Sequence, residues 1–289
     1  MTELRYEAPE SIEAAVALLG DNAKTAKIFA GGTDLLVQMR EQIIDPTLLI
    51  DIKKIPETQG ITITSDSIRI GASVCGAELG ESIELNRTWP GVVEAAGLIG
   101  SEQIQGRATL AGNICNASPA ADSVPALIAA NARTEVAGPN GMNNLPVQDI
   151  AVGPGKISLG TGEFIAAIIL PKPPPRSGDA YLRFIPRTEM DIAVVGVGVS
   201  LSLNDQGYCT SARVVLGAVA PTARIAETAS NVLVGDKISK TLLDEAASAA
   251  RKVCSPIDDK RGTGEFRTKV AGVLTRRAIK IAWKRAEKH

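Results

Sequence analysis

The sequence is almost free of histidine. Its one histidine, His289, is the last of 289 residues, where chains usually fray. A Ser-His-Asp triad, a Cys-His pair and a histidine-ligated metal site all need a histidine held inside the fold. The sequence therefore argues against these three kinds of site. It leaves demanding chemistry to a bound organic cofactor or to a partner protein.

Cysteine is scarce and scattered. The four cysteines, Cys75, Cys115, Cys209 and Cys254, form no C-x-x-C pair, and the closest two are about 40 residues apart. Structural zinc sites and locally ligated iron–sulfur clusters use closely spaced cysteines, so we expect neither in this chain. Isolated cysteines in a chain of this size are typical of buried free thiols in a reducing compartment.

The sequence has neither an excess of positive charge nor many aromatic residues. Lysine and arginine number 31 against 32 acidic residues, and aromatic residues make up 3%. Binding to nucleic acid or anionic lipid uses a positive field, and base stacking uses aromatic side chains. We therefore expect no nucleic-acid partner.

Long hydrophobic runs are also missing. The longest uncharged apolar run, 192–204, is short of the roughly 20 residues that a membrane-spanning helix needs. The first ten residues carry three glutamates in place of the basic start and apolar stretch of an export signal. We expect no membrane span and a cytoplasmic location.

Strands and helices alternate over residues 1–56. The spacing of apolar residues predicts strands at 4–7, 27–30 and 47–51, separated by helices at 9–19 and 34–42. Strands separated by helices indicate a small parallel βαβ unit.

The pattern changes over residues 57–175. Alternating apolar residues on either side of Ser65-Asp66 predict a hairpin. The same segment predicts helices at 75–85, 90–100 and 122–131. It also predicts strands at 133–137 and 163–170. Between them lies an irregular stretch, 101–119, rich in Gly, Asn, Ser and Pro. Loops longer than about 12–15 residues inside a compact domain are usually functional or disordered.

Three consecutive prolines within 172–179 mark the clearest boundary, because they cannot continue a strand or a helix. Beyond them the sequence predicts strands at 192–203 and 208–220, and helices at 223–233, 240–253 and 265–287. The prediction is therefore an α+β protein in three parts, 1–56, 57–175 and 176–289, the last an antiparallel sheet covered by helices.

The first candidate site is the Gly31-Gly32 turn, which follows a predicted strand and precedes a predicted helix. Successive backbone N–H groups converge at such a turn and suit a phosphate, and glycine permits close approach and positive φ. Asp34 would repel a phosphate and more plausibly caps the helix. On its own, the turn is also compatible with an ordinary strand-to-helix connection that binds no ligand.

The second candidate site is the segment 109–122, T-L-A-G-N-I-C-N-A-S-P-A-A-D. Small polar residues in a row leave an open backbone surface with many short donors and acceptors, which suits a polar, extended ligand. The alternative is a surface loop in which Asp122 caps the following helix.

Taken together, the A-G-G-T-D-L turn and the T-L-A-G-N-I-C-N-A-S-P-A-A-D segment resemble the FAD-binding medium subunit of molybdenum hydroxylases, the family of carbon monoxide dehydrogenase and xanthine dehydrogenase. The resemblance extends to the opening R-Y-E-A-P-E-S-I-E-A-A-V-A-L-L and to R-F-I-P-R-T-E-M-D-I-A-V-V at 183–195. It implies two α/β subdomains that clasp FAD, followed by a C-terminal domain of antiparallel sheet and helices.

The resemblance also implies which residues bind FAD. It assigns the pyrophosphate to the turn, hydrogen bonds from cofactor hydroxyls to Asp122, packing against the flavin ring to Ile165, and a place near the ring to Arg183. The family commonly has a lysine at this last position, and an arginine keeps the charge but replaces a point charge with a planar fork. The full implied set is Lys27, Ile28, Phe29, Ala30, Gly31, Gly32, Thr33, Asp34, Leu35, Ile99, Gly100, Thr109, Gly112, Asn113, Asp122, Ile165 and Arg183.

Two features of some relatives are missing. The chain has no cysteine-rich insertion that would hold an iron–sulfur cluster. The Trp and Arg residues that gate NAD access in xanthine dehydrogenases of animal type are replaced by Gly97-Leu98 and Thr188. The resemblance therefore does not imply NAD as the electron acceptor.

The function that the resemblance implies is electron transfer. FAD in this chain would collect electrons from two [2Fe-2S] clusters of a small partner subunit, after a molybdenum–pterin site in a large partner subunit oxidises the substrate. The complex would be a dimer of heterotrimers. Alternatives are a stand-alone flavin-dependent oxidase or dehydrogenase, against which the missing internal histidine counts, and a non-catalytic FAD-binding assembly protein.

Overall fold

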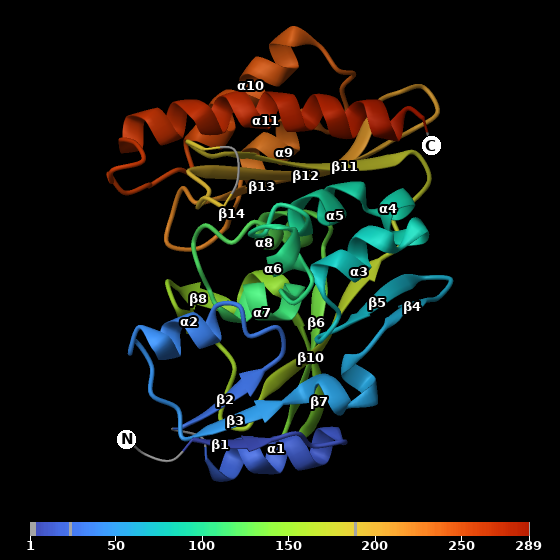
Figure 1. Ribbon diagram of the computed structural model, residues 1–289. Helices are drawn as coiled ribbons and strands as arrows, with labels where there is room; N and C mark the ends of the chain where they lie inside the picture. The colour runs from blue at the N-terminus through green and yellow to red at the C-terminus, as the bar shows by residue number, and fades with distance from the viewer. Residues whose placement is uncertain (1–3, 23–24, 188–189, 289) are drawn as a thin grey trace.

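The computed structural model describes residues 4–22, 25–187 and 190–288. Three main sheets follow one another from the bottom to the top of Figure 1, with three, five and four strands. This arrangement confirms the predicted α+β class. None of the described helices is both long enough and apolar enough to cross a membrane.

The first sheet is parallel, with the strand order β1-β3-β2, as predicted. The central strand β3 is buried along its whole length, because α1 and the middle part of the protein cover its two faces. The elements of this part are β1 (Arg5–Glu7), α1 (Ile12–Asp21), β2 (Ala26–Phe29), α2 (Leu35–Arg40) and β3 (Leu48–Asp51).

The middle sheet is antiparallel, with the strand order β4-β5-β10-β6-β7. Its central strand β10 is buried over most of its length, which accounts for its unbroken apolar sequence. The strands are β4 (Ile61–Ile63), β5 (Ser67–Gly71), β6 (Arg133–Gly138), β7 (Gly141–Pro146) and β10 (Phe164–Pro171), with a separate hairpin of β8 (Ala151–Gly153) and β9 (Lys156–Ile157).

Two predictions for the middle part are wrong. The single helix expected at 75–85 is two helices, because Ser82 is extended and its side chain accepts a hydrogen bond from the Leu85 amide to begin a new helix. The stretch 101–119, expected to be irregular, contains two further short helices. The helices are α3 (Gly76–Glu81), α4 (Ile83–Thr88), α5 (Pro90–Ala96), α6 (Glu102–Gln105), α7 (Leu110–Cys115) and α8 (Ser123–Ala129).

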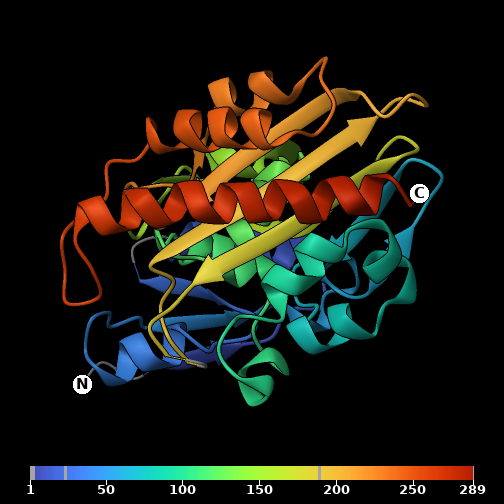
Figure 2. The ribbon, with the colours of Figure 1, turned by 90° about the horizontal axis from the view of Figure 1, so that it is seen from above.

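The C-terminal sheet is antiparallel, with the order β11-β12-β13-β14, and helices cover one face. Figure 2 shows α11 lying across its strands with α10 beside it. This confirms the predicted C-terminal architecture, although β11 and β14 were not predicted. The elements are β11 (Ser177–Phe184), β12 (Val195–Leu203), β13 (Cys209–Gly217), β14 (Arg224–Ile225), α9 (Glu227–Leu233), α10 (Lys240–Arg251) and α11 (Gly264–Ala286).

The middle part packs against the C-terminal sheet at two glycines. A Cβ on Gly198 of β12 would lie 2.5 Å from the carbonyl oxygen of Pro125 in α8, and one on Gly217 of β13 would lie 2.6 Å from the Pro125 ring. Both distances are far below van der Waals contact. The sheet therefore carries glycine at these points because α8 lies directly on its backbone.

Asp179 of β11 forms a second junction between the same two parts. Its Oδ2 accepts a hydrogen bond of 3.2 Å from the Val92 amide at the start of α5, and its buried Oδ1 has no partner among the described residues. Arg285 of α11 donates to the Asp179 carbonyl at 2.7 Å and also pairs with Glu94. Burial raises the pKa of the Asp179 carboxyl to about 7, and the hydrogen bonds and Arg285 only partly oppose this.

This buried carboxyl predicts a pH-dependent stability. A carboxyl whose pKa is higher in the folded protein stabilises the fold fully below its unfolded pKa, and this contribution is lost as the pH rises to about 7. We predict that the unfolding free energy of the wild type, measured by urea titration, falls between pH 5 and pH 8 relative to that of Asp179→Asn. The difference should be on the order of 2–3 kcal/mol.

The control is Asp205→Asn, at an exposed position in the turn between β12 and β13. Its unfolding free energy should change with pH as that of the wild type does. Parallel pH profiles for the wild type and Asp179→Asn would contradict the prediction.

Candidate functional site

The Gly31-Gly32 turn contacts the backbone of Arg107 and Ala108, the two residues directly before the second segment. A Cβ on Gly31 would lie 2.1 Å from the carbonyl oxygen of Arg107 and 3.1 Å from the Cα of Ala108. The Arg107 side chain in turn donates a hydrogen bond of 3.2 Å to the Gly31 carbonyl. Glycine is therefore required at position 31 because the backbone of Arg107 occupies the space of a side chain.

The next residue, Gly32, has φ +75°, a left-handed conformation that L-residues other than glycine rarely adopt. A Cβ here would also lie 2.4 Å from the ring of Phe29. The chain thus turns sharply between β2 and α2, and the turn exposes backbone toward the second segment.

A hydrogen-bond network around the buried Asp51 carboxylate supports this turn. Lys53 donates hydrogen bonds to the Ala30 carbonyl at 3.1 Å and to both Asp51 oxygens at 2.7 Å, and its ammonium lies 4.3 Å from the centre of the Phe29 ring. Tyr6 donates to the same carboxylate. Burial alone would raise the pKa of Asp51, but the hydrogen bonds from Lys53 and Tyr6 outweigh it and hold that pKa below its ordinary value.

The second segment begins with a helix N-cap. The Thr109 side chain accepts a hydrogen bond of 3.0 Å from the Gly112 amide and begins α7. A Cβ on Gly112 would lie 3.0 Å from that same Thr109 oxygen. Asn113, one residue on, accepts a 2.7 Å hydrogen bond from the Ser123 hydroxyl at the start of α8.

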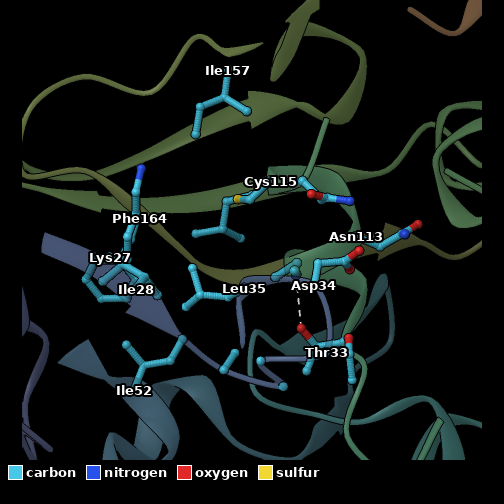
Figure 3. Close-up of a pocket in the computed structure, with 18 of the residues that line it drawn as sticks. Lys27, Ile28, Thr33, Asp34, Leu35, Ile52, Asn113, Cys115, Ile157 and Phe164 are labelled. Carbon is cyan, nitrogen blue, oxygen red and sulfur yellow. Dashed lines mark hydrogen bonds between the residues drawn. The ribbon is translucent and has the colours of Figure 1, made fainter. Parts of the chain in front are cut away.

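A cavity of ≈ 410 Å³ lies between the two segments. Figure 3 shows apolar side chains, including Ile28, Leu35 and Ile157, around one part of it, and the polar side chains of Thr33, Asp34 and Asn113 around another. A cavity of this size with apolar walls and a few convergent polar groups is typical of a ligand site.

Free backbone donors line the polar part. The amides of Gly32, Thr33 and Asp34 donate no hydrogen bond to any of the residues that the structure describes. Unused amides in succession along a turn form a site for an anion such as a phosphate. Asp34 occupies the N-cap position of α2 without making a side-chain cap, and loss of contact with water raises its pKa.

Comparison with known families shows to which family the chain belongs. Residues 2–173 match the family described as "FAD binding domain in molybdopterin dehydrogenase", and residues 180–282 match "CO dehydrogenase flavoprotein C-terminal domain". The chain belongs to this family of FAD-binding proteins. The resemblance noted in the sequence is confirmed, and the cavity between the two segments is its candidate FAD site.

Individual relatives match over almost the whole chain. The carbon monoxide dehydrogenase medium chain of Hydrogenophaga pseudoflava is 34% identical over 97% of both chains, and the xanthine dehydrogenase FAD-binding subunit of Escherichia coli O157:H7 is 30% identical over 96% of this chain and 95% of its own. A crystal structure of the Hydrogenophaga pseudoflava carbon monoxide dehydrogenase superposes with a TM-score of 0.93 at 35% identity, covering 98% of both chains.

The structure brings most of the predicted FAD-binding residues together around this cavity. Those that line it are Lys27, Ile28, Ala30, Gly31, Gly32, Thr33, Asp34, Leu35, Ile99, Thr109, Gly112, Asn113 and Ile165. Four others do not: Phe29, Gly100, Asp122 and Arg183. Phe29 is buried, and its ring leaves no room for a side chain at position 32.

Asp122 and Arg183 pair with each other at the junction with the C-terminal sheet. Arg183 of β11 donates a 2.7 Å hydrogen bond to one Asp122 oxygen, and Tyr181 donates one of 2.9 Å to the other. Asp122 therefore makes no side-chain cap on α8. Burial raises its pKa, while Arg183 and Tyr181 act in the opposite direction.

The next arginine of the stretch 183–195 forms a different ion pair. Arg187 pairs with Asp191, which also pairs with Arg261, whereas Arg183 forms the buried pair with Asp122. Thr188 and Glu189 lie outside the described residues.

Sequence reasoning missed several residues of the cavity wall. Gln38 extends from α2, Cys115 from α7, and Gly155 and Ile157 from the β8–β9 hairpin, with Glu163 just before β10. Cys115 lies inside the second segment, where the sequence predicts a buried thiol. No local motif marks the others, because they meet only when the sheets assemble. Burial raises the pKa of Cys115 to about 12, so the thiol is uncharged at neutral pH. No group of three or more potential metal ligands comes together among the described residues.

The contact between Gly31 and Arg107 predicts a loss of flavin on a minimal substitution. Gly31→Ala adds one methyl group that must push the two segments apart, at a cost typical of overpacking, about 1–3 kcal/mol. We predict that the flavin-to-protein ratio of the purified protein, measured by absorbance, falls roughly tenfold, with the far-ultraviolet circular dichroism retained.

Gly80→Ala in α3, where a Cβ would have no neighbour within 4 Å, is the matched control and should keep its flavin. Full occupancy in Gly31→Ala would mean that the separation of the two segments does not control binding.

Proposed function

We propose that this protein is the FAD-carrying electron-transfer subunit of a molybdenum hydroxylase complex. The observation that carries the proposal is the meeting of the Gly31-Gly32 turn with the residues before α7, beside a cavity lined by three residues whose amides have no partner among the described residues. This geometry occurs in a chain that matches carbon monoxide dehydrogenase medium chains over nearly its full length.

The cavity fits a dinucleotide in its chemistry. The amides at Gly32, Thr33 and Asp34 would bind the pyrophosphate, because they are donors with no partner of their own. Thr109, Gly112 and Asn113 would surround the dinucleotide from the other side, where Gly112 keeps the wall open. Ile165 of β10, buried and lining the cavity, would supply an apolar surface for the ring.

We retain Asp122 and Arg183 as cofactor residues in the proposal. Each carboxylate oxygen has two lone pairs, so Asp122 can accept a cofactor hydroxyl while bonded to Tyr181 and Arg183. Arg183 fixes the orientation of that carboxylate and keeps a positive charge at the junction. Gly100, with φ +65° and next to the cavity-lining Ile99, would shape the edge of the site.

Bound FAD supplies the redox chemistry, accepting and releasing electrons singly or in pairs. The chain's own residues bind and orient it and limit access of water. A chain that only binds the cofactor needs no catalytic histidine or metal ligands of its own. The sequence has one histidine, and no metal-binding cluster occurs among the described residues.

The remaining parts of the proposed reaction lie in partners. Relatives named as medium chains or FAD subunits include nicotine 6-hydroxylase of Paenarthrobacter nicotinovorans, and a medium chain implies a small and a large one. We propose that a small subunit with two [2Fe-2S] clusters delivers electrons to FAD and that a large subunit holds the molybdenum–pterin site, in a dimer of heterotrimers. Four free thiols support a reducing, cytoplasmic location.

The proposal predicts that substrate reduces the flavin only through partners. The tagged chain purified from its native host should retain two further subunits, identified by mass spectrometry, and flavin. Under anaerobic conditions, dithionite should bleach the flavin of the chain with or without partners, whereas an organic substrate of the complex should bleach it only with both partners present.

Bleaching by substrate in the absence of partners would favour a stand-alone flavin enzyme. A flavin-containing chain that never associates with other subunits would favour a storage or assembly role.

A further inference from the structure

One wall of the cavity is formed by α2, a helix that packs only loosely against the rest of the protein. Helix α2 has no buried residue, and its outward side chains Leu36 and Val37 are 47% and 46% exposed. On the inward side, Leu35 and Gln38 line the cavity, as does Ile44 in the following loop. The helix therefore covers the ligand site without being part of either hydrophobic core.

Among the described residues, a single side-chain hydrogen bond connects α2 to the opposite wall. Gln38 Nε2 donates to Asn116 Oδ1 at 3.0 Å, and both side chains line the cavity. Asn116 is the C-cap residue of α7, which belongs to the other subdomain. The bond thus bridges the cavity from one subdomain to the other, and Figure 1 shows α2 facing α7 in this way.

Residues at both ends of α2 have left-handed backbone conformations. Gly32 has φ +75° just before the helix, and Gln42 has φ 57° two residues beyond its end. The chain reverses sharply at these two points, and the segment between them is connected to β2 and β3 only through these turns. These two points are where a rigid movement of α2 would most directly change φ and ψ.

We propose that α2 is a lid over the cavity and that the Gln38–Asn116 hydrogen bond is its latch. This inference rests on the proposed function, with FAD as the ligand. A dinucleotide enclosed between two subdomains leaves by displacement of one wall, and α2 is the wall with the least burial. The latch holds the lid closed and slows the release of FAD, while the amides of the turn supply the binding contacts.

The test is a double-mutant cycle on the rate of FAD release. Gln38→Met keeps the length of the side chain but cannot donate, and Asn116→Ala removes the acceptor. FAD-containing protein, with the partners that co-purify, is diluted, and the rise in free-flavin fluorescence gives the release rate. Loss of one neutral hydrogen bond should speed release roughly 2- to 12-fold in each variant.

Coupling distinguishes a latch from two independent contacts. The double variant should release FAD no faster than the faster single variant, because the second substitution removes a bond that is already lost. Arg40→Ala, on the exposed face of α2, is the control and should release FAD at the wild-type rate. Hydrogen exchange of residues 35–44 in the FAD-containing protein should be faster in both single variants than in the control.

Two outcomes would overturn the latch while leaving the proposed function in place. One is a double variant whose FAD release is accelerated by the product of the two single effects, and the other is an unchanged release rate in both single variants. A wild-type protein that never contains FAD would overturn the proposed function itself.

Discussion

The site depends on a contact between two pieces of backbone. The carbonyl of Arg107 fills the space that any side chain at Gly31 would need, so two pieces of chain that are far apart in the sequence close on each other without side chains between them. The candidate FAD site is built around this approach. Residues of the turn and of α7 line the same cavity as apolar residues of β2 and β10.

Polar networks around the contact hold each side in place. Lys53 binds the Ala30 carbonyl directly before the turn, and its own position is fixed by Asp51 and the Phe29 ring. On the other side, Thr109 caps α7 and Asn113 binds the start of α8. Because α8 lies directly on the C-terminal sheet at Gly198 and Gly217, the second wall is continuous with the C-terminal domain. The small parallel sheet of the first wall shares a hydrophobic core with the middle part. Helix α2, by contrast, contributes no buried residue and is the more weakly held part of the two walls.

Much of this architecture could be predicted from the sequence, because its signals are local. Alternation of strands and helices identified the parallel sheet, and the prolines at 173–175 identified the end of the middle sheet. Strand β11 was missed because Ser177, Gly178 and Asp179 give it a polar start, and Asp179 is buried only by virtue of α5 and α11. The glycines of the turn were noticed for their possible contact with an anion, whereas the structure shows that Gly31 is required by Arg107. Gln38 carries no sequence signal, and nothing distinguishes Asn116 within the second segment, since the roles of both arise from a bond between subdomains.

The central claim is that both segments bind one FAD together. Hydrogen–deuterium exchange, compared before and after removal of the flavin, tests it directly. The account predicts that residues 31–35 and 109–116 both exchange faster once the flavin is removed, while strands β12 and β13 of the C-terminal sheet are unchanged. A change confined to one of the two segments, or located away from both, would contradict it.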